Sequence, residues 1–149
     1  MYSKHETSRI KQLFWTSFGQ YMKPVPSASG EKVNWPNYKT GIGHIYFRMR
    51  AEKGHASIAI ELTGSSASQE TQFEQFLQLK TLLHGMLGEE WVWESSVADE
   101  NGHTISRIHT SITGVNVMDQ SSWPAIISFL KQRIMVLDEF WVGVREMFE

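Results

Sequence analysis

Two stretches of this chain alternate apolar and polar residues, and that alternation constrains the fold more than any other feature of the sequence. A period of two is typical of a β-strand that has one face in a core and the other in solvent. The apolar positions of residues 44–50 and 55–62 are Ile45, Phe47, Met49, Ala56, Ile58, Ile60 and Leu62. The chain is therefore expected to contain a sheet whose two faces differ in polarity.

Segments with helical periodicity surround these two strands. Their apolar residues recur at intervals of three and four, which predicts an amphipathic helix in each segment. The segments are residues 4–22, 65–88 and 121–148. The last of them is apolar on more than one stripe, so we expect it to be the most buried helix.

Three more strands complete the expected sheet. Residues 91–98 and 103–112 flank Asn101-Gly102, a dipeptide typical of a hairpin turn. Residues 32–40 are expected to form a further strand, and Pro36 within them favours an edge position. The resulting order, α-β-β-β-α-β-β-α, predicts an α+β fold with a mostly antiparallel sheet and helices packed on one face.

Length and composition exclude several classes of protein. The chain has 149 residues, which predicts a single domain over residues 1–149. It contains no cysteine, which excludes disulfides, thiolate metal sites and cysteine nucleophiles. A formal charge of -2 provides no general attraction to nucleic acid or anionic membranes. Since the sequence shows neither a signal peptide nor a long apolar run, we expect a cytoplasmic location without membrane contact.

The residues that usually carry catalysis or bind metals form no recognisable group in the sequence. The six histidines do not pair with carboxylates at the spacing that metal sites use. No G-x-S-x-G motif occurs, and Gly41-Ile42-Gly43 lacks the third glycine of a dinucleotide-binding loop. We therefore predict no metal and no cofactor, and we favour a protein without catalytic activity.

The expected hairpin places three charged or titratable residues on the polar face of the sheet. Glu94, Arg107 and His109 share that face in either hairpin register. A two-residue turn would pair Glu94 with His109, whereas a four-residue loop would pair Glu94 with Arg107. Both registers place the neighbouring tryptophans on the buried side.

Tyr46, Arg48, Arg50 and Glu61 occupy the same polar face of the two alternating stretches. If both strand groups join in one sheet, these residues and those of the hairpin form a continuous polar surface that suits an anion or a polar ligand. The alternative is that the cross-strand arginine and glutamate residues are solvent-exposed ion pairs that bind no ligand, which is commoner on an exposed sheet.

Trp35 is a separate binding candidate. Unlike the other tryptophans, it falls outside the helical and apolar strand patterns. We therefore expect an exposed platform on which a base or a sugar could stack. Because Trp35 lies in the expected edge strand, a homodimer built through that edge is a further possibility.

Several short motifs resemble those of a known family. They are F-W-x-x-F-G at residues 14–19, W-x-x-Y-x-T-G at residues 35–41 and S-R-I at residues 106–108. The chain resembles the bacterial family called domain of unknown function 4268, in its stand-alone form, over essentially its whole length. That family brings no assigned activity. Longer members carry nuclease-like segments, so the resemblance implies a role near DNA-processing systems.

The element order is also similar to the restriction-endonuclease-like core of PD-(D/E)XK nucleases, in which carboxylates hold magnesium. In that resemblance Glu61 is a candidate metal ligand and Glu94 a substitute ligand, but Thr63 stands where a lysine is needed. We therefore predict a non-enzymatic binding or interaction module whose partner is an unidentified protein or nucleic acid. The alternative is a divergent or degenerate magnesium-dependent nuclease that uses Glu61 and Glu94.

Overall fold

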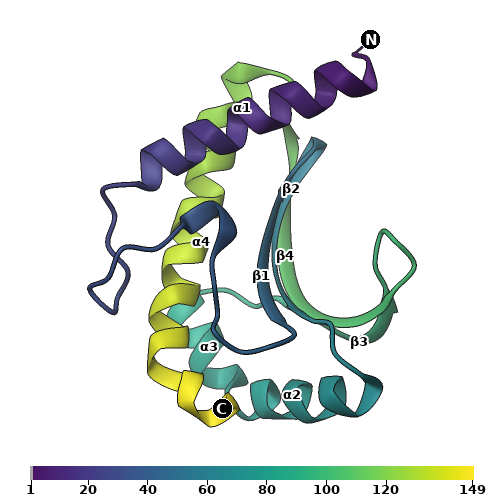
Figure 1. The fold of residues 1–149 in the computed structure, drawn as a ribbon, viewed down its shortest axis with the longest axis vertical. Coiled ribbons are helices and arrows are strands. Elements are labelled where there is room, and N and C mark those ends of the chain that lie inside the picture. Colours follow the sequence, from purple (N-terminus) through teal and green to yellow (C-terminus); the bar gives the residue numbers. More distant parts are fainter. Residues whose placement is uncertain (1) are drawn as a thin grey trace.

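One antiparallel sheet forms the centre of the fold, with its strands in the order β1-β2-β4-β3 (Figure 1). The computed structural model describes residues 2–149. The strands are β1 (Ile45–Ala51), β2 (Lys53–Leu62), β3 (Val92–Ala98) and β4 (Thr104–Asn116). Both strand groups expected from the sequence therefore join in a single sheet.

The α-helices of the described residues are α1 (Lys4–Met22), α2 (Ser66–Gln78), α3 (Lys80–Leu87) and α4 (Trp123–Val144). Figure 1 shows α1 and α4 along one face of the sheet and α2 beneath its lower end. The sheet curves away from α1 and α4, so that its other face is concave and free of helices (Figure 1). The predicted α+β class, with antiparallel strands and helices on one face, is confirmed.

The apolar stripe predicted from the alternation is the face that packs against the helices. Ile45, Phe47, Ile58, Ile60 and Ile108 are all 5% exposed or less. Burial of one such side chain contributes about 1.5–3 kcal/mol to folding. Among the α4 residues that complete this core are Ile126, Leu130, Ile134, Leu137 and Trp141. Alternation along the strands therefore decides which sheet face meets the helices.

The strand expected over residues 32–40 does not form. The chain instead makes a short 3-10 helix, η1 (Trp35–Asn37), followed by extended backbone at Tyr38. Pro36 has no N–H to donate to a sheet ladder, and the Asn34 side chain accepts a hydrogen bond from the Asn37 N–H group. Local turn chemistry therefore overrides the strand pattern, and β1 rather than this segment is an edge of the sheet.

Trp35 is not an exposed platform, so that prediction is wrong. The side chain is 2% exposed, and its Nε1 atom donates to the carbonyl of Val25 at 2.9 Å. Its ring packs beside Tyr38, with ring centroids 6.0 Å apart. Because Trp35 lies neither on a strand nor at the surface, the edge through which a homodimer was expected does not exist.

The helix expected over residues 65–88 is divided in two at Leu79. Ser65 caps α2 by accepting a hydrogen bond from the Ser68 N–H group, and Gly88 ends α3 in the left-handed conformation with φ of 70°. Between them, Leu79 has φ of -100° and ψ of 6°, outside the helical region. The break redirects the chain from the lower end of the sheet towards α4.

The hairpin that joins β3 and β4 is longer than a tight turn. Ala98 pairs with Thr104, so the connecting loop comprises residues 99–103. The register shifts between Glu94 and Val97 through a β-bulge, in which Ser96 has φ of 54°. Beyond the bulge Glu94 pairs with Arg107, which is the pairing predicted for the longer loop.

Candidate functional site

A row of four side chains crosses the whole concave face of the sheet, one from each strand. Tyr46 on β1 is opposite Glu61 on β2, Glu61 is opposite Arg107 on β4, and Arg107 is opposite Glu94 on β3. Neighbouring strands lie about 4.8 Å apart, and within this row Arg107 and Glu94 form an ion pair at 2.8 Å. Arg48, Arg50 and His109 flank the row, and we call these seven residues the concave surface.

Glu61 is the most buried member of the concave surface, at 5% exposed. Its Oε2 atom accepts a hydrogen bond from Arg50 Nη1 at 2.9 Å, and its Oε1 atom lies 3.6 Å from Arg48 Nε. A carboxylate removed from water costs free energy unless it has hydrogen-bonding or cationic partners. The two arginines provide them, and Glu61 in turn fixes where both guanidinium groups lie.

Glu94 organises a second cluster on the neighbouring strands. Its Oε1 atom accepts a hydrogen bond from Arg107 Nε at 2.8 Å and lies 2.7 Å from His109 Nε2. These two interactions, Arg107 first and His109 second, lower the pKa of Glu94 below its ordinary value. All three side chains are between a quarter and a third exposed, so this cluster is open to solvent.

Arg48 differs from the other arginines of the surface because no side chain within residues 2–149 accepts a close hydrogen bond from its guanidinium group. Its side chain is 48% exposed, and the guanidinium carbon lies 4.3 Å from the centroid of the Tyr46 ring. Stacking of this kind fixes the plane of a guanidinium group without using its N–H donors.

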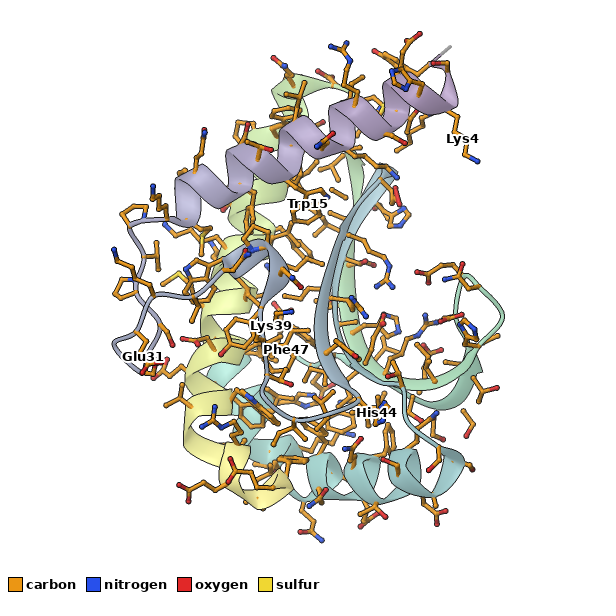
Figure 2. The ribbon with its side chains drawn as sticks, in the orientation of Figure 1. Lys4, Trp15, Glu31, Lys39, His44 and Phe47 are labelled. Atoms are coloured by element: carbon orange, nitrogen blue, oxygen red, sulfur yellow. The ribbon has the colours of Figure 1, made fainter. Side chains whose placement is uncertain are left out.

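A cavity of about 570 Å³ opens on the concave surface. Arg48, Arg50 and Glu61 form its floor together with Tyr46, and residues 99–101 and His103 of the β3–β4 loop line its other side. Figure 2 shows polar side chains projecting between the sheet and this loop. Its volume lies within the range typical of small-molecule sites, about 300–1,000 Å³, but its lining is more polar than usual.

The structure brings most of the sequence-predicted site residues together. Tyr46, Arg48 and Glu61 share one cluster, and Glu94, Arg107 and His109 share the adjacent one, whereas Trp35 is buried elsewhere. Sequence reasoning placed Arg50 on the polar face but left it out of the candidate binding residues, although its position two residues after Arg48 was a usable signal. It also missed the loop residues, because only the curvature of the sheet brings them over its face.

The two acids that the nuclease resemblance would use do not adjoin each other. Glu61 and Glu94 lie on β2 and β3, and Arg107 on β4 stands between them. Arginines engage the carboxylate oxygens of both. Within residues 2–149, no three histidine or acidic side chains gather in a way that could hold a metal ion.

These features define an α+β domain that carries an open, charged cavity on the concave face of an antiparallel sheet. The chain belongs to the family described as Domain of unknown function (DUF4268), whose sequence profile matches residues 10–145. That match confirms the family predicted from the short motifs. Among curated proteins and solved structures, none matches the chain. No helix within residues 2–149 combines the length and apolarity that a membrane span requires.

Proposed function

We propose that this protein is a non-enzymatic binding module that holds a polar, anion-bearing partner on its concave surface. The observation that carries the proposal is Arg48, which is half-exposed, stacked on Tyr46 and left with free N–H donors beside a cavity. A guanidinium group held in place before binding loses little conformational entropy when an anion docks.

The burial of Glu61 favours a binding role over a set of solvent-exposed ion pairs without a ligand. Exposed ion pairs contribute about 0–1 kcal/mol each to stability. Glu61 is instead almost completely buried between two arginines, and such pairs are weak evidence for stability because desolvation offsets their attraction. The buried Glu61 carboxylate instead fixes the spacing of the Arg48 and Arg50 guanidinium groups at the cavity.

A double substitution tests this proposal. Arg48→Ala with Arg107→Ala removes one arginine from each cluster, keeps Arg50 on Glu61, and leaves the apolar face of the sheet untouched. Immobilised wild-type and variant proteins would be compared for capture from a bacterial lysate, and each captured molecule would then be purified and titrated. We expect affinity for that molecule to fall at least tenfold, while the thermal midpoint changes little. Arg9→Ala, an exposed arginine on α1, serves as the control.

The family resemblance implies a role near DNA-processing systems, so oligonucleotides would be titrated against the same wild-type and variant proteins. A divergent magnesium-dependent nuclease is the alternative function, supported by the presence of Glu61 and Glu94 in one cross-strand row. Incubation with single- and double-stranded DNA and RNA, with magnesium or manganese, tests it directly. If the wild type cleaves nucleic acid and Glu61→Ala does not, the protein is a nuclease and the proposal of a non-enzymatic binding module is wrong.

A further inference from the structure

Arg50 joins two carboxylates that differ sharply in their access to solvent. Its Nη1 atom donates to Glu61 Oε2 and its Nη2 atom donates to Glu100 Oε1, both at 2.9 Å. The Glu61 side chain is 6% exposed, whereas the Glu100 side chain is 60% exposed. A solute can therefore reach the Glu100 side of the guanidinium group but not the Glu61 side.

The loop that carries Glu100 has an internal structure of its own. Asp99 Oδ1 accepts hydrogen bonds from the backbone N–H groups of Asn101 and His103, each 2.9 Å long. Gly102, with φ of 80°, completes the turn in a conformation that favours glycine. Figure 1 shows this loop rising opposite the concave face of β1 and β2. None of these hydrogen bonds involves the Glu100 side chain, so the turn keeps them when that side chain leaves Arg50.

Arg48 extends the same binding position along β1. Arg48 and Arg50 lie two residues apart on one strand face, which separates their Cα atoms by about 7 Å. Both line the cavity, and Arg48 has no close acceptor among residues 2–149. An anion that replaced Glu100 on Arg50 would therefore find a second guanidinium group beside it.

We propose that Glu100 is an internal stand-in for the carboxylate of a ligand, and that the ligand opens the cavity by displacing Glu100 from Arg50. The inference rests on the proposed function, because the ligand uses the same concave surface. A carboxylate is favoured because Glu100 itself shows that this group fits Arg50.

The charges of the cavity distinguish a single carboxylate from a polyanion. Its lining contains two arginines and three acids, which are Arg48, Arg50, Glu61, Asp99 and Glu100. A chain of phosphates would add repulsion against these acids. One carboxylate that takes the place of Glu100 leaves the balance unchanged, so a molecule or protein segment with a single acidic group fits the site best.

Glu100→Gln removes the internal competitor and preserves the size of the side chain. An exposed ion pair populates its closed form only a few times more than its open form, so affinity for a free carboxylate should rise about two- to sixfold. Glu90→Gln is the matched control, because Glu90 is exposed, lies outside the cavity lining and loses the same charge.

Heteronuclear NMR of the full chain, with the arginine Nε–H signals resolved, provides the measurement. The probes are butyrate, an acetylated and amidated Ala-Glu-Ala tripeptide, its Ala-Gln-Ala counterpart and inorganic phosphate, all at constant ionic strength. Butyrate tests a free small acid with one carboxylate, and the tripeptide tests an acidic side chain of a partner protein. We expect butyrate or the tripeptide to shift the signals of Arg48 and Arg50 and to bind more tightly to Glu100→Gln than to wild type or Glu90→Gln.

The possible outcomes separate this inference from the proposed function. Equal affinities of wild type and Glu100→Gln, with binding lost in Arg48→Ala, overturn the stand-in role but leave the binding surface intact. Binding that survives in Arg48→Ala overturns the surface itself. Tighter binding of phosphate than of either carboxylate overturns the ligand class. If none of the probes shifts the arginine signals of Glu100→Gln, the stand-in role fails as well.

Discussion

Two carboxylates, Glu61 and Asp138, are buried to a similar extent in this molecule, but their hydrogen-bonding partners differ in charge. Asp138 on α4 is 2% exposed and accepts hydrogen bonds from Ser27 Oγ, the Ala28 N–H group and the Tyr38 hydroxyl at 2.6–2.8 Å. These donors are all neutral. Glu61, in contrast, is held by two arginines at the edge of an open cavity.

The partners of a buried acid indicate whether it serves folding or binding. The donors to Asp138 come from the irregular segment between α1 and β1, so the acid fastens that segment to α4. Burial and the hydrogen bond to Asp138 raise the pKa of Tyr38 well above its ordinary value, which keeps the hydroxyl as a donor. Glu61 instead holds Arg48 and Arg50 at the open cavity, where the proposed ligand would meet them.

The largest expected effect is on folding, from Asp138→Ala. This change leaves the buried hydroxyls of Ser27 and Tyr38, and the part-buried Ala28 N–H group, without an acceptor. An unsatisfied buried group costs about 1–3 kcal/mol, so we expect a loss of about 3–5 kcal/mol after relaxation. Urea unfolding followed by circular dichroism measures it. Asp138→Asn, which keeps one acceptor oxygen, should lose less. A loss below about 1 kcal/mol in the alanine variant would show that Asp138 does not hold the segment between α1 and β1 to α4.

Arg50→Ala tests the other carboxylate and is expected to have a smaller effect on stability. It removes the close partner of Glu61 and leaves Arg48 at 3.6 Å. Breaking a fully buried pair costs about 3–5 kcal/mol, but the Arg50 side chain is 29% exposed, so we expect about 2 kcal/mol. Arg50→Lys, measured in the same denaturation, should recover part of that loss. If Arg50→Ala unfolds as the wild type does, Glu61 does not depend on Arg50.

Tyr38→Phe removes one of the three donors to Asp138 and keeps the packing of its ring against Phe47. We expect a loss of about 1–2 kcal/mol, with no change in binding at the concave surface. Thermal unfolding measures the stability, and the butyrate titration measures the binding. Weakened binding in this variant would show that the two carboxylate regions are coupled, against the comparison drawn above.

The smallest effect concerns pH and the exposed cluster around Glu94. Because Arg107 and then His109 lower its pKa from the ordinary 4.5, ionised Glu94 stabilises the folded state above about pH 4.5. That contribution is lost as the pH falls through the lower pKa of the folded state. Denaturation from pH 6 to pH 3 should show a loss specific to the wild type, relative to Glu94→Gln, of less than about 1 kcal/mol. A larger acid-induced loss in Glu94→Gln would reverse the sign.

The sequence predicted the sidedness of the concave surface well, because alternation is a local property of strands. Tyr46, Arg48 and Glu61 were placed on the polar face from their positions alone, and the structure puts them there. Trp35 was misplaced, because the Asn37 N–H group donates to the Asn34 side chain and turns the chain there, and the Trp35 Nε1 atom donates to the carbonyl of Val25, ten residues earlier. A residue pattern carries no information about such partners.

Periodicity and hairpin chemistry by themselves determined the α+β class, the helices and the face on which each strand residue lies, since each depends on neighbours a few positions apart. Only the tertiary structure decided that Glu100 meets Arg50, fifty positions away, and that Asp138 meets Tyr38 across a hundred. Those contacts depend on how far the sheet curves and how α4 crosses it, and both follow from packing summed over the whole core.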